Sequence, residues 1–246
     1  MTKMQKRTLR ISIVLAAILA VSPAAGAMHI MEGYLSPLFC IAWGVVCLPF
    51  FVKGLYEMKK VFAENKKAVT ILAMAGAYIF VLSALKIPSV TGSCSHMTGA
   101  GLAAILFGPS ITGILGSIVL IFQAVLLAHG GLTTLGANTF SMAIAGPAAA
   151  YGIWLVCQKF NINKRAGIFV AAAVGDLGTY CITSFQLAFA YPDPNGGVLA
   201  SAAKFLGVFA PTQLPLAVAE GALTVMIMVA LENYAAQELK AIRYEK

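Results

Sequence analysis

The sequence predicts an all-α membrane protein, a polytopic bundle of about seven transmembrane segments that follow a cleaved signal peptide. Of its 246 residues, 60% are hydrophobic and only 11% are charged, with a mean hydropathy of +0.87. Soluble domains have about 45–50% apolar and about 25% charged residues. The composition therefore excludes an ordinary soluble domain, a disordered chain and a nucleic-acid-binding protein. The apolar residues gather in stretches near the roughly 20 residues of a membrane crossing, and the basic residues lie between them.

Residues 1–27 have the organisation of a secretory signal peptide. Four basic residues come first, an uncharged apolar run from Ile11 to Val21 follows, and Pro23 precedes the small-residue sequence Ala25-Gly26-Ala27. This order indicates cleavage after Ala27. The alternative is a first transmembrane helix, but the run is short and ends at a helix-breaking proline. We therefore expect residues 28–246 to form a single transmembrane domain that begins with Met28.

Seven apolar segments follow in the mature chain. They cover residues 34–52, 68–85, 97–108, 110–128, 139–158, 166–190 and 205–231. The third is short for a full crossing, and Gly108-Pro109 separates it from the fourth. This pair is either a re-entrant hairpin or two short tilted helices, because non-helical backbone at membrane depth requires burial in protein or a cavity.

The basic residues predict how these segments are oriented. The loop 53–67 carries five lysines, and the loop 159–165 and the C-terminal tail carry three basic residues each. Cytoplasmic loops are enriched in Lys and Arg, so this end is expected in the cytoplasm. A cleaved signal leaves the mature N-terminus outside, and seven segments then end inside, which agrees. The N-terminus and the loops 87–96, 129–138 and 191–204 are expected at the outer face.

The sequence offers little enzymatic chemistry. It has no G-x-x-x-x-G-K-[ST] motif, so it carries no P-loop for ATP. Four of the five cysteines lie in apolar segments, where they behave as small hydrophobic residues. Cys94 lies in a predicted outer loop beside His96 and leaves one alternative from another class, an intramembrane thiol-dependent enzyme. A channel with passive flux is a further alternative.

The three histidines, His29, His96 and His129, all lie in the predicted outer face. After cleavage His29 is the second residue, so the Met28 amine, the His29 amide nitrogen and the His29 Nδ1 can chelate one ion through adjacent five- and six-membered rings. A fourth nitrogen would complete a square-planar site, which suits Ni(II) or Cu(II) and is also open to Co(II). The spacing does not decide between His96 and His129 as the fourth ligand. The alternative is that the Met-His pair is a coincidence.

Three stretches carry a resemblance to a known family. They are MHIMEGYL at residues 28–35, PSVTGSCSH at 88–96 and HGGLTTLGANTFSM at 129–142. They resemble the cobalt-specific, substrate-binding membrane subunits (CbiM type) of energy-coupling-factor transporters, over residues 28 to about 232. The resemblance implies a bundle with the N-terminal segment at its centre. It implies Co(II) as the transported substrate, no organic cofactor, and Met28, His29 and His96 as ligands.

The resemblance also implies partners. These are a small two-span accessory subunit, a transmembrane coupling subunit and cytoplasmic ATPase subunits, in the inner membrane. A Ni(II)-specific subunit stays an alternative, because nickel-specific relatives share these ligands; Met31-Glu32 is more like the cobalt branch.

Several polar residues could support the site. Glu32, Gln123, His129 and Asn138 could orient a ligand through hydrogen bonds. Asp176 and Glu220 are the acidic residues expected well inside the apolar segments, where a carboxylate is costly. They are either functional or hydrogen-bonded to hydroxyl and backbone groups.

Overall fold

The computed structural model describes residues 29–64, 66–88 and 94–242. The predicted signal peptide and Met28 lie outside these residues. The described chain is nearly all helical, as the sequence predicts. In order, its elements are α2 (Pro37–Glu64), α3 (Ala68–Ala84), β1 (Ile87–Pro88), β2 (Cys94–Ser95), α4 (Ala100–Phe107), α5 (Pro109–Leu127), α6 (Leu135–Asn138), the π-helix η2 (Thr139–Ala145), α7 (Gly146–Lys159), α8 (Lys164–Ala190), α9 (Gly197–Tyr234) and α10 (Ala236–Ala241).

Five helical runs are long and apolar enough to cross a membrane: α2, α5, the continuous run Leu135–Lys159, α8 and α9. The other two predicted segments are shorter, with 17 residues in α3 and eight in α4. At 1.5 Å per residue, eight residues extend about 12 Å, against about 30 Å for the hydrocarbon core. The third predicted segment is therefore a half-length helix, joined at Gly108 to the full-length α5.

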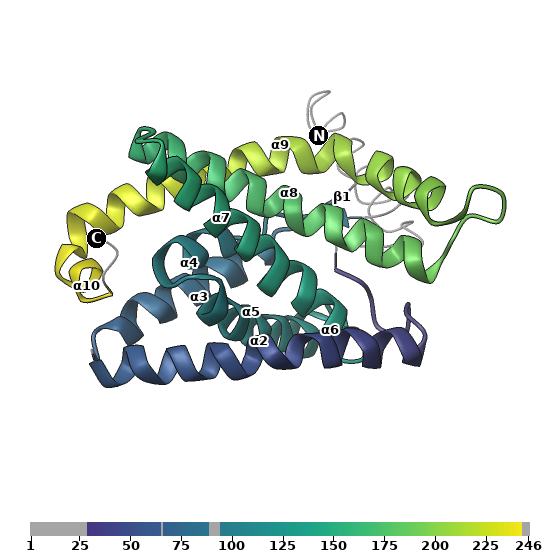
Figure 1. Cartoon of the computed structure of the whole chain (residues 1–246), viewed down its shortest axis with the longest axis horizontal. Helices are drawn as coiled ribbons and strands as arrows, with labels where there is room; N and C mark the ends of the chain where they lie inside the picture. Colours follow the sequence, from purple (N-terminus) through teal and green to yellow (C-terminus); the bar gives the residue numbers. More distant parts are fainter. Residues whose placement is uncertain (1–28, 65, 89–93, 243–246) are drawn as a thin grey trace, which may run out of the picture.

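α4 lies inside the bundle. Helix α2 runs along one side of the molecule and α8 and α9 run together along the other, with α4 between them (Figure 1). Residues 100–106 of α4 are all buried. In contrast, only 11% of the most apolar part of α2 is buried, against 56% for α5. Helix α2 is therefore a peripheral helix whose exposed apolar side chains suit a lipid environment.

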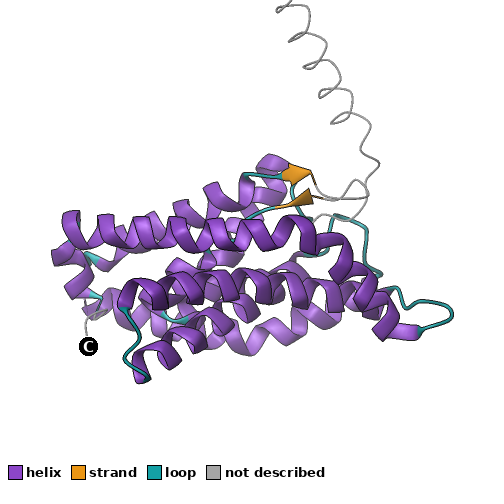
Figure 2. Cartoon of the chain, turned by 90° about the horizontal axis from the view of Figure 1, so that it is seen from above, coloured by secondary structure: helices purple, strands orange, loops and turns teal. Residues whose placement is uncertain are grey.

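The short strands β1 and β2 lead into α4. They pair antiparallel, with Ile87 opposite Ser95, and they form the one sheet among the described residues (Figure 2). Residues 95–100 are buried, so the chain runs from this pair directly into the interior. This path carries His96 into the bundle.

Three predicted helix boundaries were wrong. Helix α2 continues past residue 52 to Glu64, α6 begins inside the predicted loop 129–138, and α9 begins inside the predicted loop 191–204. The apolar pattern ends where the membrane ends, but a helix continues while its residues favour it. Lys and Glu are good helix formers, and Lys53 pairs with Glu57 one turn later at 3.8 Å.

Small residues and prolines shape the helices around the centre. A Cβ on Gly101 of α4 would lie 2.9 Å from the Ala172 Cα of α8, so these helices touch through backbone. Helix α9 contains Pro211 and Pro215, which cannot donate to the helix ladder. Gln213 lies between these prolines. Directly after Asn138, η2 is a π-helical stretch, a feature often found at functional sites.

Candidate metal centre

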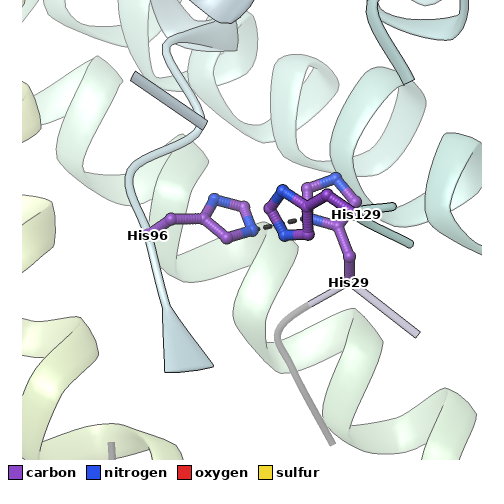
Figure 3. A group of neighbouring side chains, drawn as sticks. All are labelled: His29, His96 and His129. Carbon is purple, nitrogen blue, oxygen red and sulfur yellow. Dashed lines mark hydrogen bonds between the residues drawn. The ribbon is translucent and has the colours of Figure 1, made fainter. Parts of the chain in front are cut away.

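The structure brings the three histidines together. His29 precedes α2, His96 follows β2 and His129 follows α5, and each is at most 2% exposed. One candidate ligand atom from each lies within 4.8 Å of the other two (Figure 3). Both histidines that the sequence left open as partners of His29 are thus present at one buried position.

His29 and His96 face each other most directly. Nδ1 of His29 lies 2.5 Å from Nε2 of His96, and the two ring planes differ by 29°. Nδ1 of His96 lies 2.9 Å from the carbonyl oxygen of Met97, which can only accept a hydrogen bond. The proton of a neutral His96 ring is therefore on Nδ1, and the lone pair of Nε2 is directed at His29.

Burial keeps the three imidazoles neutral. Loss of solvation lowers the pKa of His96 to about 4 and that of His129 to about 2, and it lowers the pKa of His29 well below its ordinary value. The nearby Lys86 ammonium acts in the same direction on all three. A metal ion binds the neutral form of imidazole, so the three rings have lone pairs available at pH 7.

Asn138 fixes the backbone beside His29. Its Oδ1 accepts a hydrogen bond from the Ile30 amide at 2.7 Å, and its Nδ2 donates to the Ile30 carbonyl at 2.9 Å. Thr134 also donates to the Ile30 carbonyl, at 2.7 Å. The N-terminal segment is thus held as a neighbouring β-strand would hold it. Sequence reasoning missed Thr134, although it lies in the same motif as Asn138.

Glu32 and Gln123 hold the His129 loop. Glu32 is exposed, and its carboxylate accepts from the Thr133 amide at 3.1 Å. Hydrogen bonding from the Thr133 side chain and then from this amide lowers the pKa of Glu32. The Gln123 side chain donates to the Ser83 hydroxyl at 2.6 Å, and its backbone carbonyl accepts from the His129 amide at 3.1 Å. The Glu32 side chain thus bonds to the loop that follows His129, and the Gln123 side chain bonds to helix α3.

A buried polar network ties the His96 segment to α8 and α9. Gln213 Nε2 donates to the His96 carbonyl at 3.2 Å and to Asp176 Oδ2 at 2.5 Å. The Glu220 carboxylate accepts from the Thr98 amide at 2.5 Å and from the Thr98 hydroxyl at 2.9 Å. Asp176 and Glu220 are thus bonded to amide and hydroxyl groups. Gln213 was missed because a neutral polar residue hardly interrupts an apolar run.

The cysteines offer no assembled nucleophile among the described side chains. Cys40, Cys47, Cys157 and Cys181 are free thiols that are buried or half-buried. Cys47 donates to the Gly136 carbonyl at 3.3 Å, a packing contact between α2 and α6. The side chain of Cys94, on which the enzyme alternative depends, lies outside the described part of the structure.

Comparisons with known proteins match this chain to cobalt transport proteins. The family model described as "cobalt uptake substrate-specific transmembrane region" (CbiM) matches residues 29–238. A cobalt transport protein CbiM from Lachnoclostridium phytofermentans is 65% identical over 239 residues, which cover 97% of this chain and 96% of that protein. A protein of the same name from Nostoc sp. is 55% identical over 226 residues, which cover 92% of this chain and 87% of that protein.

Two solved structures have a similar fold. A truncated transition metal transporter is 27% identical with a TM-score of 0.74, and the match covers 84% of this chain and 99% of that one. A transition metal transporter is also 27% identical, with a TM-score of 0.73 and a match over 83% of this chain and 92% of that one. The chain therefore belongs to the CbiM family of cobalt-uptake, substrate-specific transmembrane proteins.

Proposed function

We propose that this chain is the substrate-binding membrane subunit of an ATP-driven energy-coupling-factor importer and that its transported substrate is Co(II). The single observation that carries the proposal is the pair of buried nitrogens, His29 Nδ1 and His96 Nε2, at 2.5 Å. Membership of the CbiM family supports cobalt as the ion. The proposed role is transport without enzymatic catalysis, with ATP hydrolysis in partner subunits.

The proposed site has four nitrogens in one plane. They are the Met28 amine, the His29 amide, His29 Nδ1 and His96 Nε2. In this arrangement the two imidazole nitrogens are neighbours at two corners of the plane. With metal–nitrogen bonds of about 2.0–2.1 Å, such neighbours lie about 2.8–3.0 Å apart. The 2.5 Å separation of the free nitrogens is close to this value, so a small movement of either ring would admit an ion.

The site requires a free amine on Met28, so the proposal includes cleavage after Ala27. Residues 28–246 then form one domain, with the mature N-terminus outside and the C-terminus in the cytoplasm. The proposed partners are a small two-span accessory subunit, a transmembrane coupling subunit and cytoplasmic ATPases. Transport would begin when the ion binds at the outer face and would end when ATPase action reorients the bundle.

The test alters the N-terminus alone. The full chain is purified from membranes, its N-terminus is determined by intact mass, and Co(II) and Ni(II) binding are measured by competition. A second chain has three serines inserted between Ala27 and Met28. A single inserted residue is avoided because a histidine in third position forms a different N-terminal chelate.

We expect the unmodified chain to begin at Met28 and to bind one Co(II). The inserted chain, cleaved after Ala27, should lose most of this affinity because its amine is too far from His29. Equal affinity in a chain with a verified N-terminal serine would refute the N-terminal chelate. Tighter binding of Ni(II) than of Co(II) by the unmodified chain would instead assign the protein to nickel.

A further inference from the structure

His129 occupies a position that the four-nitrogen site does not use. Helix α5 ends at Leu127 and is followed by its C-cap Ala128, which adopts the left-handed conformation with φ +46°; the His129 amide donates to the Gln123 carbonyl at 3.1 Å. This turn brings His129 against the other two rings. The centroid of its ring lies 4.3 Å from that of His29 and 5.1 Å from that of His96.

The orientation of the His129 ring differs from that of the pair. The rings of His29 and His96 are within 29° of parallel, whereas the His129 ring is tilted by 59° from His29 and by 88° from His96. In Figure 3 the His129 ring overlaps the His29 ring while His96 lies to the side. The His129 ring is therefore not stacked with the other two rings. It approaches the His29–His96 pair at a steep angle.

Both ring nitrogens of His129 are without a hydrogen-bond partner among the described residues, although the side chain is only 2% exposed. Burial of a polar group without a partner is costly, so an unpartnered imidazole at this position points to a ligand. The candidate nitrogen lies within 4.8 Å of those of His29 and His96. An apical ligand stands at about 90° to each planar ligand, so its nitrogen would lie roughly 3 Å from theirs when metal–nitrogen bonds are about 2.0–2.1 Å. Rotation of the His129 ring together with a small shift of its loop would bring this nitrogen to the ion.

We propose that His129 is the apical fifth ligand of the bound ion and that it favours Co(II) over Ni(II). This inference rests on the proposed four-nitrogen site. A plane of four strong nitrogen donors makes both ions low-spin. Low-spin Co(II) has a single electron in the orbital perpendicular to the plane and accepts one axial nitrogen. Low-spin Ni(II) has this orbital filled and prefers a square plane without an axial ligand.

Electron paramagnetic resonance of the full chain loaded anaerobically with Co(II) tests the assignment. One axial ¹⁴N should split each parallel cobalt hyperfine line into three, and labelling with ¹⁵N-histidine should turn each triplet into a doublet. In His129→Phe, which keeps a planar ring, the splitting should disappear. Its affinity for Co(II) should fall roughly 10–100-fold, while its affinity for Ni(II) should stay within a few-fold of the unmodified value.

Nickel binding serves as the internal control for folding, because it needs the four planar nitrogens and not His129. Three results would overturn the inference alone: no ¹⁴N triplet in the cobalt-loaded chain, a triplet that persists in His129→Phe, or equal losses of Co(II) and Ni(II) affinity in that variant. A chain that binds neither ion would overturn the proposed function as well.

Discussion

At the scale of single residues, burial determines which protons the site holds before an ion arrives. The pKa of His96 is lowered to about 4 and that of His129 to about 2, because the charged imidazolium loses its solvation. A lowered histidine pKa means that the proton is already absent at pH 7. In the proposed site, only the Met28 ammonium and the His29 amide then have protons to lose.

We predict that Co(II) binding releases nearly two protons at pH 7 and about one at pH 9. The terminal ammonium has an ordinary pKa of about 7.7–8.0, so it is mostly charged at pH 7 and neutral at pH 9. The amide proton is lost at both pH values. Isothermal titration calorimetry in buffers of different ionisation enthalpy measures this number. Release of three or more protons at pH 7 would mean that the imidazoles are charged in the free protein.

The sequence could place the histidines at one face but could not pair them. His29 and His96 are 67 residues apart, and their contact depends on how β2, α4 and α9 pack. The resemblance to the family implies His96 as a ligand, whereas the position of His129 against the other two rings required the structure. Asn138 illustrates a second limit: its pairing with both polar groups of Ile30 depends on a backbone approach that spacing alone does not reveal.

At the scale of elements, the half-length α4 links the His96 segment to the core. Its buried face meets α8 through Gly101 and Ala172 without an intervening side chain. Sequence reasoning found this segment short because Gly108-Pro109 interrupts the apolar pattern. It could not decide between a re-entrant hairpin and two short tilted helices, because that outcome depends on what surrounds the segment.

We predict that Gly101→Val lowers the stability of the chain and loosens the site. A Cβ here would lie 2.9 Å from the Ala172 Cα, a backbone atom that cannot move aside alone. Overpacking of this kind typically costs about 1–3 kcal/mol. Thermal unfolding in detergent should show a lower midpoint, and competition binding should show weaker Co(II) affinity.

Gly152→Ala in α7 is the matched control, because no atom lies within 4 Å of its added Cβ. Replacement of an exposed helical glycine by alanine stabilises a helix by about 0.5–1 kcal/mol. An unchanged or raised midpoint is therefore expected. If Gly101→Val matched this control in both measurements, the close approach of α4 and α8 would not matter for the site.

At the scale of the whole molecule, the basic connections lie at one end of the bundle. The end of α2, the α7–α8 connection and the end of α9 gather at one end in Figure 1, and the α8–α9 connection and the start of α2 lie at the other. Lys164 of α8 pairs with Glu232 of α9 at 2.8 Å at the basic end. The described segments that carry the positive residues used to predict a cytoplasmic face thus share one end, as a bundle with a single orientation requires.

This arrangement predicts which end is accessible from outside the cell. In a chain with its five cysteines replaced by alanine, Asn195→Cys and Ile162→Cys each introduce one exposed thiol, in the α8–α9 and α7–α8 connections respectively. A membrane-impermeant maleimide should label Asn195→Cys in intact cells. It should label Ile162→Cys only after permeabilisation.

Orientation matters because an importer must collect its ion from the outer side. The basic residues at the Ile162 end favour the cytoplasm, and a cleaved signal peptide would independently put Met28 outside. The two arguments concern different parts of the chain, so one labelling pattern tests both. The reverse pattern would leave the histidines facing the cytoplasm, where they could not capture an external ion. It would contradict the proposed import even if the same residues bound cobalt tightly.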